Sequence, residues 1–365
     1  MKLPGRLQQI TPYQPIEPFE VVSQKLGYPI EKIVKLDANE NPYGPSPKAR
    51  QALAELAYPH IYPDPESRAL RNALAEFTGV SAEHLIAGSG ADELIDLILR
   101  ATLEPNEQVM ICPPTFGMYR FDALINNGQV LEVERVNGFE LDVEEICRLG
   151  ELKQAKILFL TRPNNPDGGM TARETLERIL ALPLLVVLDE AYIEFCQEGG
   201  KLGERQSLIR EVKQRENLVV LRTFSKWAGL AGLRVGYGAF PGWLAEAIWR
   251  IKQPYNVNVA GTQAALASLK DLDCLSERVD WIKAERERLT AKLAKIPFLK
   301  PYPSQSNFIL CRVSGRDAAE LKAALSANGI LVRYYTSAGL ADCIRISVGR
   351  PEDSERLLAV LEAMI

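Results

Sequence analysis

The chain has few of the residues that metal-dependent and nucleophilic enzymes commonly use. It contains two histidines, His60 and His84, which are far apart in the sequence, and its six cysteines form no C-x-x-C pair. A zinc site and a histidine-based hydrolase are therefore not expected, and no metal site is predicted. Scattered cysteines of this kind are typical of reduced thiols in the core of a cytoplasmic protein.

Long apolar runs and blocks of positive charge are also lacking. No window approaches the roughly eighteen uninterrupted apolar residues that a membrane-spanning helix needs. The start of the chain is rich in proline and shows no apolar segment of a signal peptide. A net charge of −4 without a basic block argues against a nucleic-acid partner. We therefore expect a cytoplasmic enzyme that acts on small molecules, without membrane or nucleic-acid partners.

The length and the order of the expected elements indicate two domains. A chain of 365 residues exceeds one typical domain. From residue 46 to about residue 244, short apolar strands alternate with helices, which predicts an α/β fold with a mostly parallel sheet. Longer helices and a compact α+β unit follow. We predict an irregular arm over residues 1–35, within a segment 1–45 that joins the small domain, a large domain at 46–270 and a small domain at 271–365.

Charged residues follow two apolar segments that read as buried strands. The run Leu184–Leu188 ends in Asp189, and the run Leu218–Leu221 is soon followed by Lys226. An ionised group beside a core must be paired or bind a charged ligand, and ligands of open α/β sheets lie at the carboxyl ends of strands. An acid, a lysine and the nearby Arg234 fit pyridoxal phosphate.

Each of the three side chains would have a separate role toward that cofactor. Lys226 would form the Schiff base, Asp189 would keep the pyridine nitrogen protonated, and Arg234 would hold the phosphate with its planar fork. Lys226 and Asp189 also have ordinary alternatives, because a lysine can lie along the surface and an aspartate can cap a helix.

A glycine-rich turn, Gly88–Asp92, precedes an apolar helix. Its backbone N–H groups could bind a phosphate at the helix N-terminus, or the turn could simply cap the helix. Glu93 stands where the third glycine of a dinucleotide-binding fingerprint should be. An NAD-dependent dehydrogenase is therefore disfavoured.

These motifs together resemble a known enzyme family. The pattern Ser-Lys-x7-Arg at Ser225–Arg234 resembles fold type I aminotransferases, and the fuller run over residues 223–237 is similar to their histidinol-phosphate aminotransferase branch. The resemblance extends from Leu36–Pro45 to Arg345–Gly349. It implies the fold of fold type I pyridoxal-phosphate-dependent transferases, with a large domain, a smaller α+β domain and an active homodimer.

The resemblance also implies roles for individual residues. Phe116 would stack on the cofactor ring where the family often has tyrosine, and Asn165 and Tyr192 would bond the 3′-oxygen of the ring. The family usually has threonine where this chain has Asp167. The implied catalytic residues are Lys226, Asp189 and Tyr192; the cofactor site adds Gly90, Ala91, Asp92, Phe116, Asn165, Thr223, Ser225, Arg234 and, from the neighbouring subunit, Tyr62; the substrate site is Asn41, Tyr43 and Arg345.

The implied reaction is a transamination in histidine biosynthesis. L-histidinol phosphate and 2-oxoglutarate would be interconverted with imidazole acetol phosphate and L-glutamate. Two activities of the same fold remain open, namely an aromatic-amino-acid aminotransferase and an amino-acid phosphate decarboxylase. A cofactor-binding regulator without catalysis is a further alternative, although such proteins usually carry an added DNA-binding segment. Arg345 could also be part of a structural ion pair, and Tyr62 a plain loop tyrosine.

Overall fold

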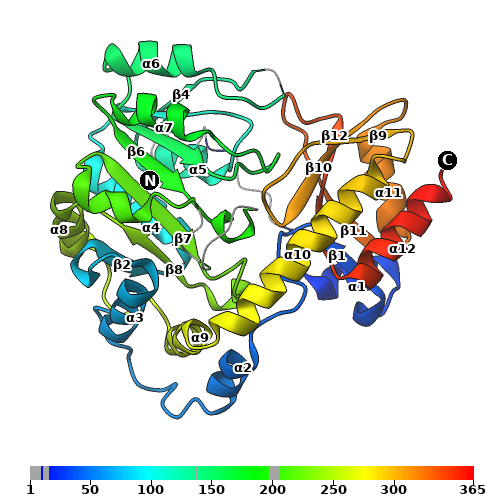
Figure 1. Ribbon diagram of the computed structural model, residues 1–365, viewed down its shortest axis with the longest axis horizontal. Helices are drawn as coiled ribbons and strands as arrows, with labels where there is room; N and C mark the ends of the chain where they lie inside the picture. Colours follow the sequence, from blue (N-terminus) through cyan, green and yellow to red (C-terminus); the bar gives the residue numbers. More distant parts are fainter. Residues whose placement is uncertain (1–9, 11–15, 137, 197–201, 203–205) are drawn as a thin grey trace, which may run out of the picture.

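A seven-stranded sheet forms the centre of the larger lobe of the computed structural model, which describes residues 10, 16–136, 138–196, 202 and 206–365 (Figure 1). Its strand order is β2-β8-β7-β6-β5-β3-β4, and only β8 pairs antiparallel to its neighbours. The predicted α/β fold with a mostly parallel sheet is thereby confirmed. The strands are β2 (Leu85–Gly88), β3 (Gln108–Ile111), β4 (Gln129–Glu132), β5 (Ile157–Thr161), β6 (Leu185–Asp189), β7 (Leu218–Thr223) and β8 (Gly236–Ala239).

Helices cover both faces of this sheet, which explains why its central strands are apolar throughout. All residues of β5, β6 and β7 are buried. Helices α4 (Gly90–Thr102), α5 (Met118–Ile125) and α8 (Gly242–Ile251) pack on one face. The other face is covered by α2 (Pro47–Ala54), α3 (Arg68–Thr78), α6 (Val143–Glu151), α7 (Arg173–Leu180) and α9 (Val259–Leu269).

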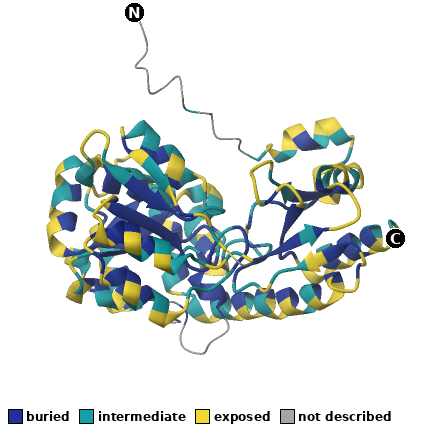
Figure 2. Cartoon of the chain, turned by 90° about the horizontal axis from the view of Figure 1, so that it is seen from above, coloured by how far each residue is buried: buried dark blue, intermediate teal, exposed yellow. Residues whose placement is uncertain are grey.

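The smaller lobe contains a five-stranded sheet in the order β1-β11-β12-β10-β9, in which only the β1–β11 pair is parallel. Figure 2 shows buried residues concentrated in the sheets of both lobes. The elements of this lobe are α1 (Phe19–Leu26), β1 (Val34–Leu36), β9 (Leu299–Pro301), β10 (Phe308–Val313), α11 (Ala318–Ala327), β11 (Ile330–Tyr334), β12 (Cys343–Ser347) and α12 (Pro351–Glu362). Short 3-10 helices lie at η2 (Ile30–Lys32), η3 (Ala82–His84), η4 (Ile193–Phe195), η5 (Ile209–Gln214) and η6 (Ala231–Leu233).

The prediction of an irregular arm over residues 1–35 is wrong for helix α1. Phe19, Val22 and Leu26 repeat at helical spacing and pack against Ile33 and Leu331. Pro18 stands directly before the helix, at its N-cap, so one of the prolines that suggested an irregular arm marks a helix start instead. Residues 1–9 and 11–15 of the predicted arm lie outside the described residues.

Helix α10 (Leu272–Leu293) connects the two lobes (Figure 1). Its first half contributes Leu275, Val279 and Ile282 to the core of the large lobe, and its end contributes Leu289 and Leu293 to the core of the small lobe. One helix therefore belongs to the cores of both lobes and does not mark where one domain ends. The predicted domain boundary at residues 270/271 stays a prediction. Within the described part of the chain, no helix combines the length and the apolar character needed to cross a membrane.

Candidate active site

Two adjoining cavities lie at the carboxyl ends of β5, β6 and β7, where ligands of open α/β sheets bind. We call the cavity of about 210 Å³ the inner cavity and that of about 420 Å³ the outer cavity. Both are lined by Ala38, Phe116, Asn165, Tyr192 and Lys226. The inner cavity is further lined by Glu40, Ala91, Asp92, Thr161, Asp189, Ala191, Thr223, Ser225, Ala231 and Arg234.

Lys226 lies between the two lobes, just past the end of β7. Its Nζ donates a hydrogen bond of 3.2 Å to the carbonyl oxygen of Ala38 and lies 5.9 Å from the centre of the Tyr192 ring. Burial, together with the positive charge of Arg345, lowers the pKa of Lys226 to about 8. A lysine with this pKa offers a neutral amine near physiological pH, as a covalent attachment to an aldehyde requires.

Asp189 ends β6 and is buried, with 4% of its surface exposed. Its Oδ1 accepts a hydrogen bond of 3.0 Å from the Ala191 N–H, and its Oδ2 accepts one of 2.7 Å from the Tyr119 hydroxyl. Burial raises the pKa of Asp189 to about 6, although both hydrogen bonds oppose this rise. A cationic ring nitrogen is the partner that would hold such a carboxylate ionised.

A cradle for an anion lies at the N-terminus of α4. Gly90 has a φ of +78°, and a Cβ atom at this residue would lie 2.4 Å from Nη2 of Arg234. Gly236 of β8 packs so closely that its own Cβ would lie 2.5 Å from the Ala91 nitrogen. The two glycines thus bring the guanidinium of Arg234 against the free N–H groups of the helix, a combination that binds phosphate.

Side chains around this cradle complete the donor set. Arg234 forms an ion pair of 2.9 Å with Asp92, and both side chains are more than 40% exposed. An exposed pair is weak, so a phosphate dianion can take over the guanidinium. The Thr223 hydroxyl donates to the Ser225 hydroxyl at 2.9 Å, and Arg234 Nη1 lies 3.5 Å from that same oxygen.

Asn165 and Tyr192 line both cavities. Asn165 Oδ1 accepts a hydrogen bond of 2.6 Å from Nη1 of Arg345. The Tyr192 hydroxyl accepts one of 3.1 Å from Nδ2 of Asn39, and burial raises the Tyr192 pKa to about 12. Tyr192 is therefore a protonated hydrogen-bond donor at physiological pH.

Phe116 lines both cavities and contacts Tyr119 edge-on, with ring centroids 5.5 Å apart. Asp167, which replaces the family's usual threonine, does not line either cavity. It is buried beneath the turn that follows β5, where its carboxylate accepts hydrogen bonds from the Asn164 side chain and, at 2.7 Å, from the Gly169 N–H. The acid therefore stabilises the turn that presents Asn165.

Two arginines of the small lobe line one wall of the outer cavity. Arg345 of β12 and Arg333 of β11 are register partners in the sheet, and both line the cavity with Tyr335. Arg345 also donates to the Asp37 carbonyl oxygen at 2.9 Å. Arg333 was not predicted, because its strand shows no charged motif that distinguishes it from a surface arginine.

Three predicted residues lie away from both cavities within a single chain. Asn41 is buried and donates to the Trp227 carbonyl oxygen at 2.9 Å, which fixes the loop after Lys226. Tyr43 packs on Trp281 with ring centroids 5.2 Å apart. Tyr62 is 80% exposed. Their predicted roles toward substrate and cofactor stay predictions.

Asn39 lies in the segment Leu36–Pro45 that carries the family resemblance, but it was not among the predicted site residues. It is buried with a φ of +54°, and it lines the outer cavity. Its N–H donates to the Ser347 hydroxyl at 2.8 Å, and its carbonyl oxygen accepts a hydrogen bond of 2.8 Å from Asn307. Partners so distant in the sequence leave no local signal.

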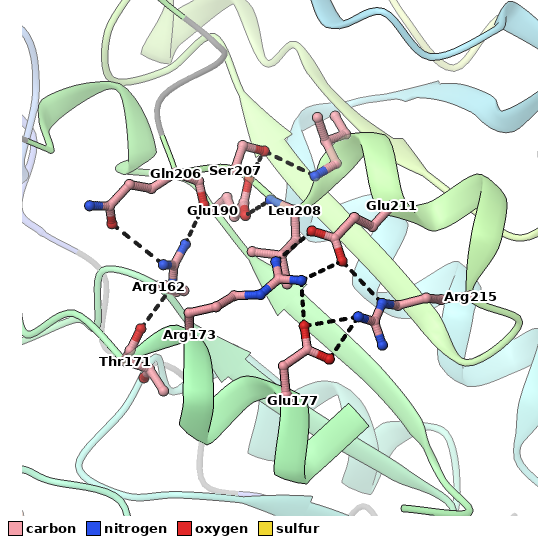
Figure 3. A network of polar contacts seen from close by, with 11 residues as sticks. Arg162, Thr171, Arg173, Glu177, Glu190, Gln206, Ser207, Leu208, Glu211 and Arg215 are labelled. Carbon is pink, nitrogen blue, oxygen red and sulfur yellow. Dashed lines mark hydrogen bonds and ion pairs between the residues drawn. The ribbon is translucent and has the colours of Figure 1, made fainter. Parts of the chain in front are cut away.

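A polar network supports the strand ends from behind (Figure 3). Glu190 follows Asp189, and its carboxylate accepts hydrogen bonds from the Ser207 hydroxyl and, at 2.9 Å, from the Leu208 N–H. Arg162 follows β5 and donates to the carbonyl oxygens of Thr171 and Gln206 at 3.1 and 2.6 Å. The network ties the ends of β5 and β6 to the segments that surround them, and so holds Asp189 in place.

Comparisons with known proteins show the family of this chain. The family described as aminotransferase class I and II matches residues 31–361. The chain is 54% identical to a chloroplastic histidinol-phosphate aminotransferase of Nicotiana tabacum over 98% of its own length and 85% of the relative's. It is 51% identical to the histidinol-phosphate aminotransferase of Roseiflexus castenholzii, over 97% of this chain and 95% of that relative.

A solved structure shows the same arrangement of the whole chain. The histidinol-phosphate aminotransferase of Sinorhizobium meliloti, crystallised in complex with pyridoxal 5′-phosphate, superposes with a TM-score of 0.88 at 29% identity, covering 100% of this chain and 98% of that one. Fold, sequence and the lysine–aspartate–arginine arrangement thus lead to one conclusion: this chain belongs to the class I and II aminotransferases, and within them to the histidinol-phosphate aminotransferase family.

Proposed function

We propose that this enzyme transfers the amino group of L-histidinol phosphate to 2-oxoglutarate, giving imidazole acetol phosphate and L-glutamate, a reaction of histidine biosynthesis. The observation that carries the proposal is the identity of 51–54% to histidinol-phosphate aminotransferases over nearly the whole chain. The site agrees with it, because a lysine, a buried aspartate and two arginines converge on adjoining cavities.

The cofactor of this enzyme is pyridoxal 5′-phosphate, which supplies an electron sink for the bond-breaking step. The residues of the inner cavity fit it. Lys226 would bind its aldehyde carbon covalently, and Asp189 would pair with its ring nitrogen. The ring oxygen would be bonded by Asn165 and Tyr192, and Phe116 would stack on the ring. The phosphate would be held by Gly90, Ala91, Asp92, Thr223, Ser225 and Arg234.

Lys226 would also move the proton. Its Nζ, as a free amine, would take the proton from the amino-bearing carbon of the donor. A pKa of about 8 suits this task, since a general base works best when its pKa lies near the working pH.

Arg345, with Arg333 beside it, would bind the anionic group of either substrate. Histidinol phosphate has no α-carboxylate, so its phosphate must occupy the place that the carboxylate of glutamate takes in the second half of the reaction. A planar guanidinium can bond both groups with two parallel hydrogen bonds. One anion site would therefore serve two different substrates.

The active unit would be a homodimer. Tyr58, Ile61, Tyr62 and Tyr255 are large, at least 45% exposed, and gathered in one region by the stack of Tyr62 on Tyr255 at 4.8 Å. Exposed aromatic residues of this kind are typical of interfaces. A second copy of this chain would cover them, and Tyr62 would then reach the cofactor phosphate of the neighbouring subunit.

The cytoplasm is the proposed location. All six cysteines are free, which suits a reducing compartment. The tobacco relative is chloroplastic, so a plastid is the alternative for a plant protein.

A panel of amino donors tests the substrate. L-histidinol phosphate, phenylalanine and tyrosine are each offered with 2-oxoglutarate, and both glutamate and carbon dioxide are measured. We expect the highest kcat/KM with histidinol phosphate and weaker use of the aromatic amino acids, because one pocket contact discriminates by only about 1–3 kcal/mol. A higher kcat/KM for phenylalanine would identify an aromatic aminotransferase, and carbon dioxide without glutamate a decarboxylase.

A further inference from the structure

A buried tyrosine, Tyr119 of α5, lies directly behind Asp189. Its hydroxyl donates to Oδ2 of Asp189 at 2.7 Å and lies 2.8 Å from the hydroxyl of Thr161. Tyr119 does not line either cavity and has no exposed surface. Its ring stacks on Phe159 with centroids 4.9 Å apart. A phenylalanine would make the same ring contacts, so packing does not explain the hydroxyl.

The hydroxyl belongs to a set of polar contacts beside the cavities, which Thr161 and Thr115 themselves line. Thr161 Oγ1 lies 3.3 Å from Thr115 Oγ1, which donates to Oδ1 of Asn164 at 3.1 Å. The amide nitrogen of Asn164 donates to the Pro114 carbonyl oxygen at 3.1 Å and to the buried carboxylate of Asp167. Tyr119 and Thr161 form one pair of hydroxyls next to Asp189, and Thr115, Asn164 and Asp167 form a hydrogen-bonded group beside them.

Counting hydrogens fixes the direction of the hydrogen bond between Tyr119 and Asp189. An ionised carboxylate can only accept, so the single hydrogen of the Tyr119 hydroxyl points to Asp189. The contact between Tyr119 and Thr161 then requires the hydrogen of Thr161. The hydrogen of Thr115 is used by Asn164, whose Oδ1 has none to give. Thr161 thus keeps the oxygen of Tyr119 occupied as an acceptor and strengthens its role as a donor.

We propose that Tyr119 is a positioning residue, whose hydroxyl holds the Asp189 carboxylate ionised and oriented for the ring nitrogen of the cofactor, with Thr161 fixing the direction of that hydrogen bond. The proposal rests on the role of Asp189 given above. A buried hydroxyl is costly unless it is bonded, and this one is bonded to the acid whose ionisation the reaction needs.

The charges around Asp189 show why it needs a donor. Burial raises its pKa, and the carboxylates of Asp92 from α4 and Glu190 from the same strand end raise it further. The hydrogen bonds from Tyr119 and the Ala191 N–H lower it. Asp189 in turn contributes to the raised pKa of Tyr192. Without the bond from Tyr119, the pKa of Asp189 would rise further, and Asp189 would compete more strongly with the ring nitrogen for the proton.

The test is Tyr119→Phe, with two readouts. The first is the ring-nitrogen resonance of the holoenzyme loaded with ¹⁵N-labelled pyridoxal phosphate, measured without substrate. The second is the pH profile of kcat/KM. We expect the ring-nitrogen resonance at neutral pH to move toward the position of unprotonated pyridine. The acid-side midpoint of kcat/KM should rise by about one pH unit, a tenfold change, because a hydrogen bond to a charged group has roughly that effect. Cofactor binding and the absorbance of the resting enzyme should persist.

Tyr237→Phe is the matched control. Tyr237 of β8 is equally buried, and its hydroxyl has no hydrogen-bond partner among the residues that the structure describes. Its removal should leave both the resonance and the midpoint unchanged. Thr161→Val should shift the resonance and the midpoint in the same direction as Tyr119→Phe, but by less. If Tyr119→Phe cannot be obtained folded, Thr161→Val becomes the test of the proposal.

Two outcomes would overturn the proposal. One is a Tyr119→Phe enzyme whose resonance and midpoint are those of the wild type, even if its Tm falls, since the hydroxyl would then serve stability alone. The other applies if Tyr119→Phe does not fold: a Thr161→Val enzyme whose resonance and midpoint are both those of the wild type. Asp189→Asn separates this failure from that of the proposed function. If that variant keeps a protonated ring nitrogen, the role proposed for Asp189 is wrong. If its ring nitrogen loses the proton, the role of Asp189 holds and only the role proposed for Tyr119 is wrong.

Discussion

Nη1 of Arg345 lies 2.6 Å from Oδ1 of Asn165, and this hydrogen bond joins the two lobes across the cavities. Asn165 follows β5 of the large sheet, whereas Arg345 lies on β12 of the small sheet. The proposed anion site is therefore attached to the proposed cofactor site through one amide. Binding of a substrate anion at Arg345 can thus affect the position of the group that bonds the cofactor ring.

Arg345→Lys tests this relationship. We expect kcat/KM to fall about ten- to a hundredfold for both histidinol phosphate and glutamate, because an ammonium cannot replace two parallel bonds to a charged group. Steady-state kinetics with each donor measures the effect. Arg316→Lys, at an exposed arginine of the small lobe, is the control and should leave kcat/KM unchanged. Loss with only one of the two donors would contradict a shared anion site.

Lys226 can be tested without turnover. Reduction of the holoenzyme with borohydride should fix the cofactor to the protein, and peptide mapping should find it on Lys226. Lys226→Ala should bind the cofactor only noncovalently and lose transamination by several orders of magnitude, because both the attachment and the proton-transferring amine are gone. The matched control is Lys252→Ala, which removes another half-buried lysine away from the cavities. Label found on a different lysine would refute the assignment.

The strands that build the site could be predicted because their signal is local. β6 and β7 are apolar runs followed by charged residues, and the glycines near Arg234 stand at recognisable spacing. Helix α1 was missed because its apolar face is short and stabilised by Leu331, a residue more than three hundred positions away.

The hydrogen-bond partners behind the site could not be predicted for the same reason. Tyr119 meets Asp189 only because α5 packs on the sheet, where the Tyr119 ring stacks on Phe159 of β5, and nothing near Tyr119 in the sequence indicates an acid. Asn39 reaches Ser347 through the pairing of the first strand with the last strands of the small sheet. Contacts of this kind depend on the tertiary fold, whereas strand ends depend on the sequence nearby.

The proposed dimer predicts complementation between two inactive variants. Lys226→Ala and Tyr62→Ala proteins are mixed and allowed to exchange subunits. A mixed dimer has one site with both residues and one with neither, so random exchange should restore about a quarter of the wild-type activity. Activity and mass are measured before and after exchange.

Tyr58→Ala provides the control for this experiment. Tyr58 is also an exposed aromatic residue of the same region, with 64% of its surface exposed, but it has no proposed role at the cofactor. This variant should remain active by itself. A monomeric protein at the working concentration, or confirmed exchange without recovery of activity, would argue against a shared site.

A buried acid outside the cavities, Asp122, is predicted to lower the stability of the folded protein as the pH rises. Asp122 of α5 is 4% exposed, and its Oδ2 has no hydrogen-bond partner among the residues that the structure describes. Burial, followed by the nearby carboxylates of Asp96 and Asp92, raises the pKa of Asp122 to about 7. In the unfolded chain this pKa is the ordinary value of about 4.

The sign of the effect follows from these two values. Below about pH 4 both states hold the proton, and Asp122 does not affect stability through titration. Between roughly pH 4 and pH 7 the unfolded state releases the proton while the folded state keeps it, so the free energy of unfolding falls by about 1.4 kcal/mol per pH unit. Above pH 7 the folded state carries an unpaired buried charge, and the loss is complete.

Asp122→Asn should remove this loss, because asparagine has nearly the same shape and no charge. We expect the variant to have a higher Tm than the wild type at pH 8, and the difference to narrow steadily as the pH is lowered toward 5. Thermal unfolding of both holoenzymes over this pH range measures it. Glu76→Gln, at an exposed glutamate of α3, should show no such difference at any pH. A Tm difference that stays constant from pH 5 to pH 8 would mean that Asp122 acts through packing and not through its charge.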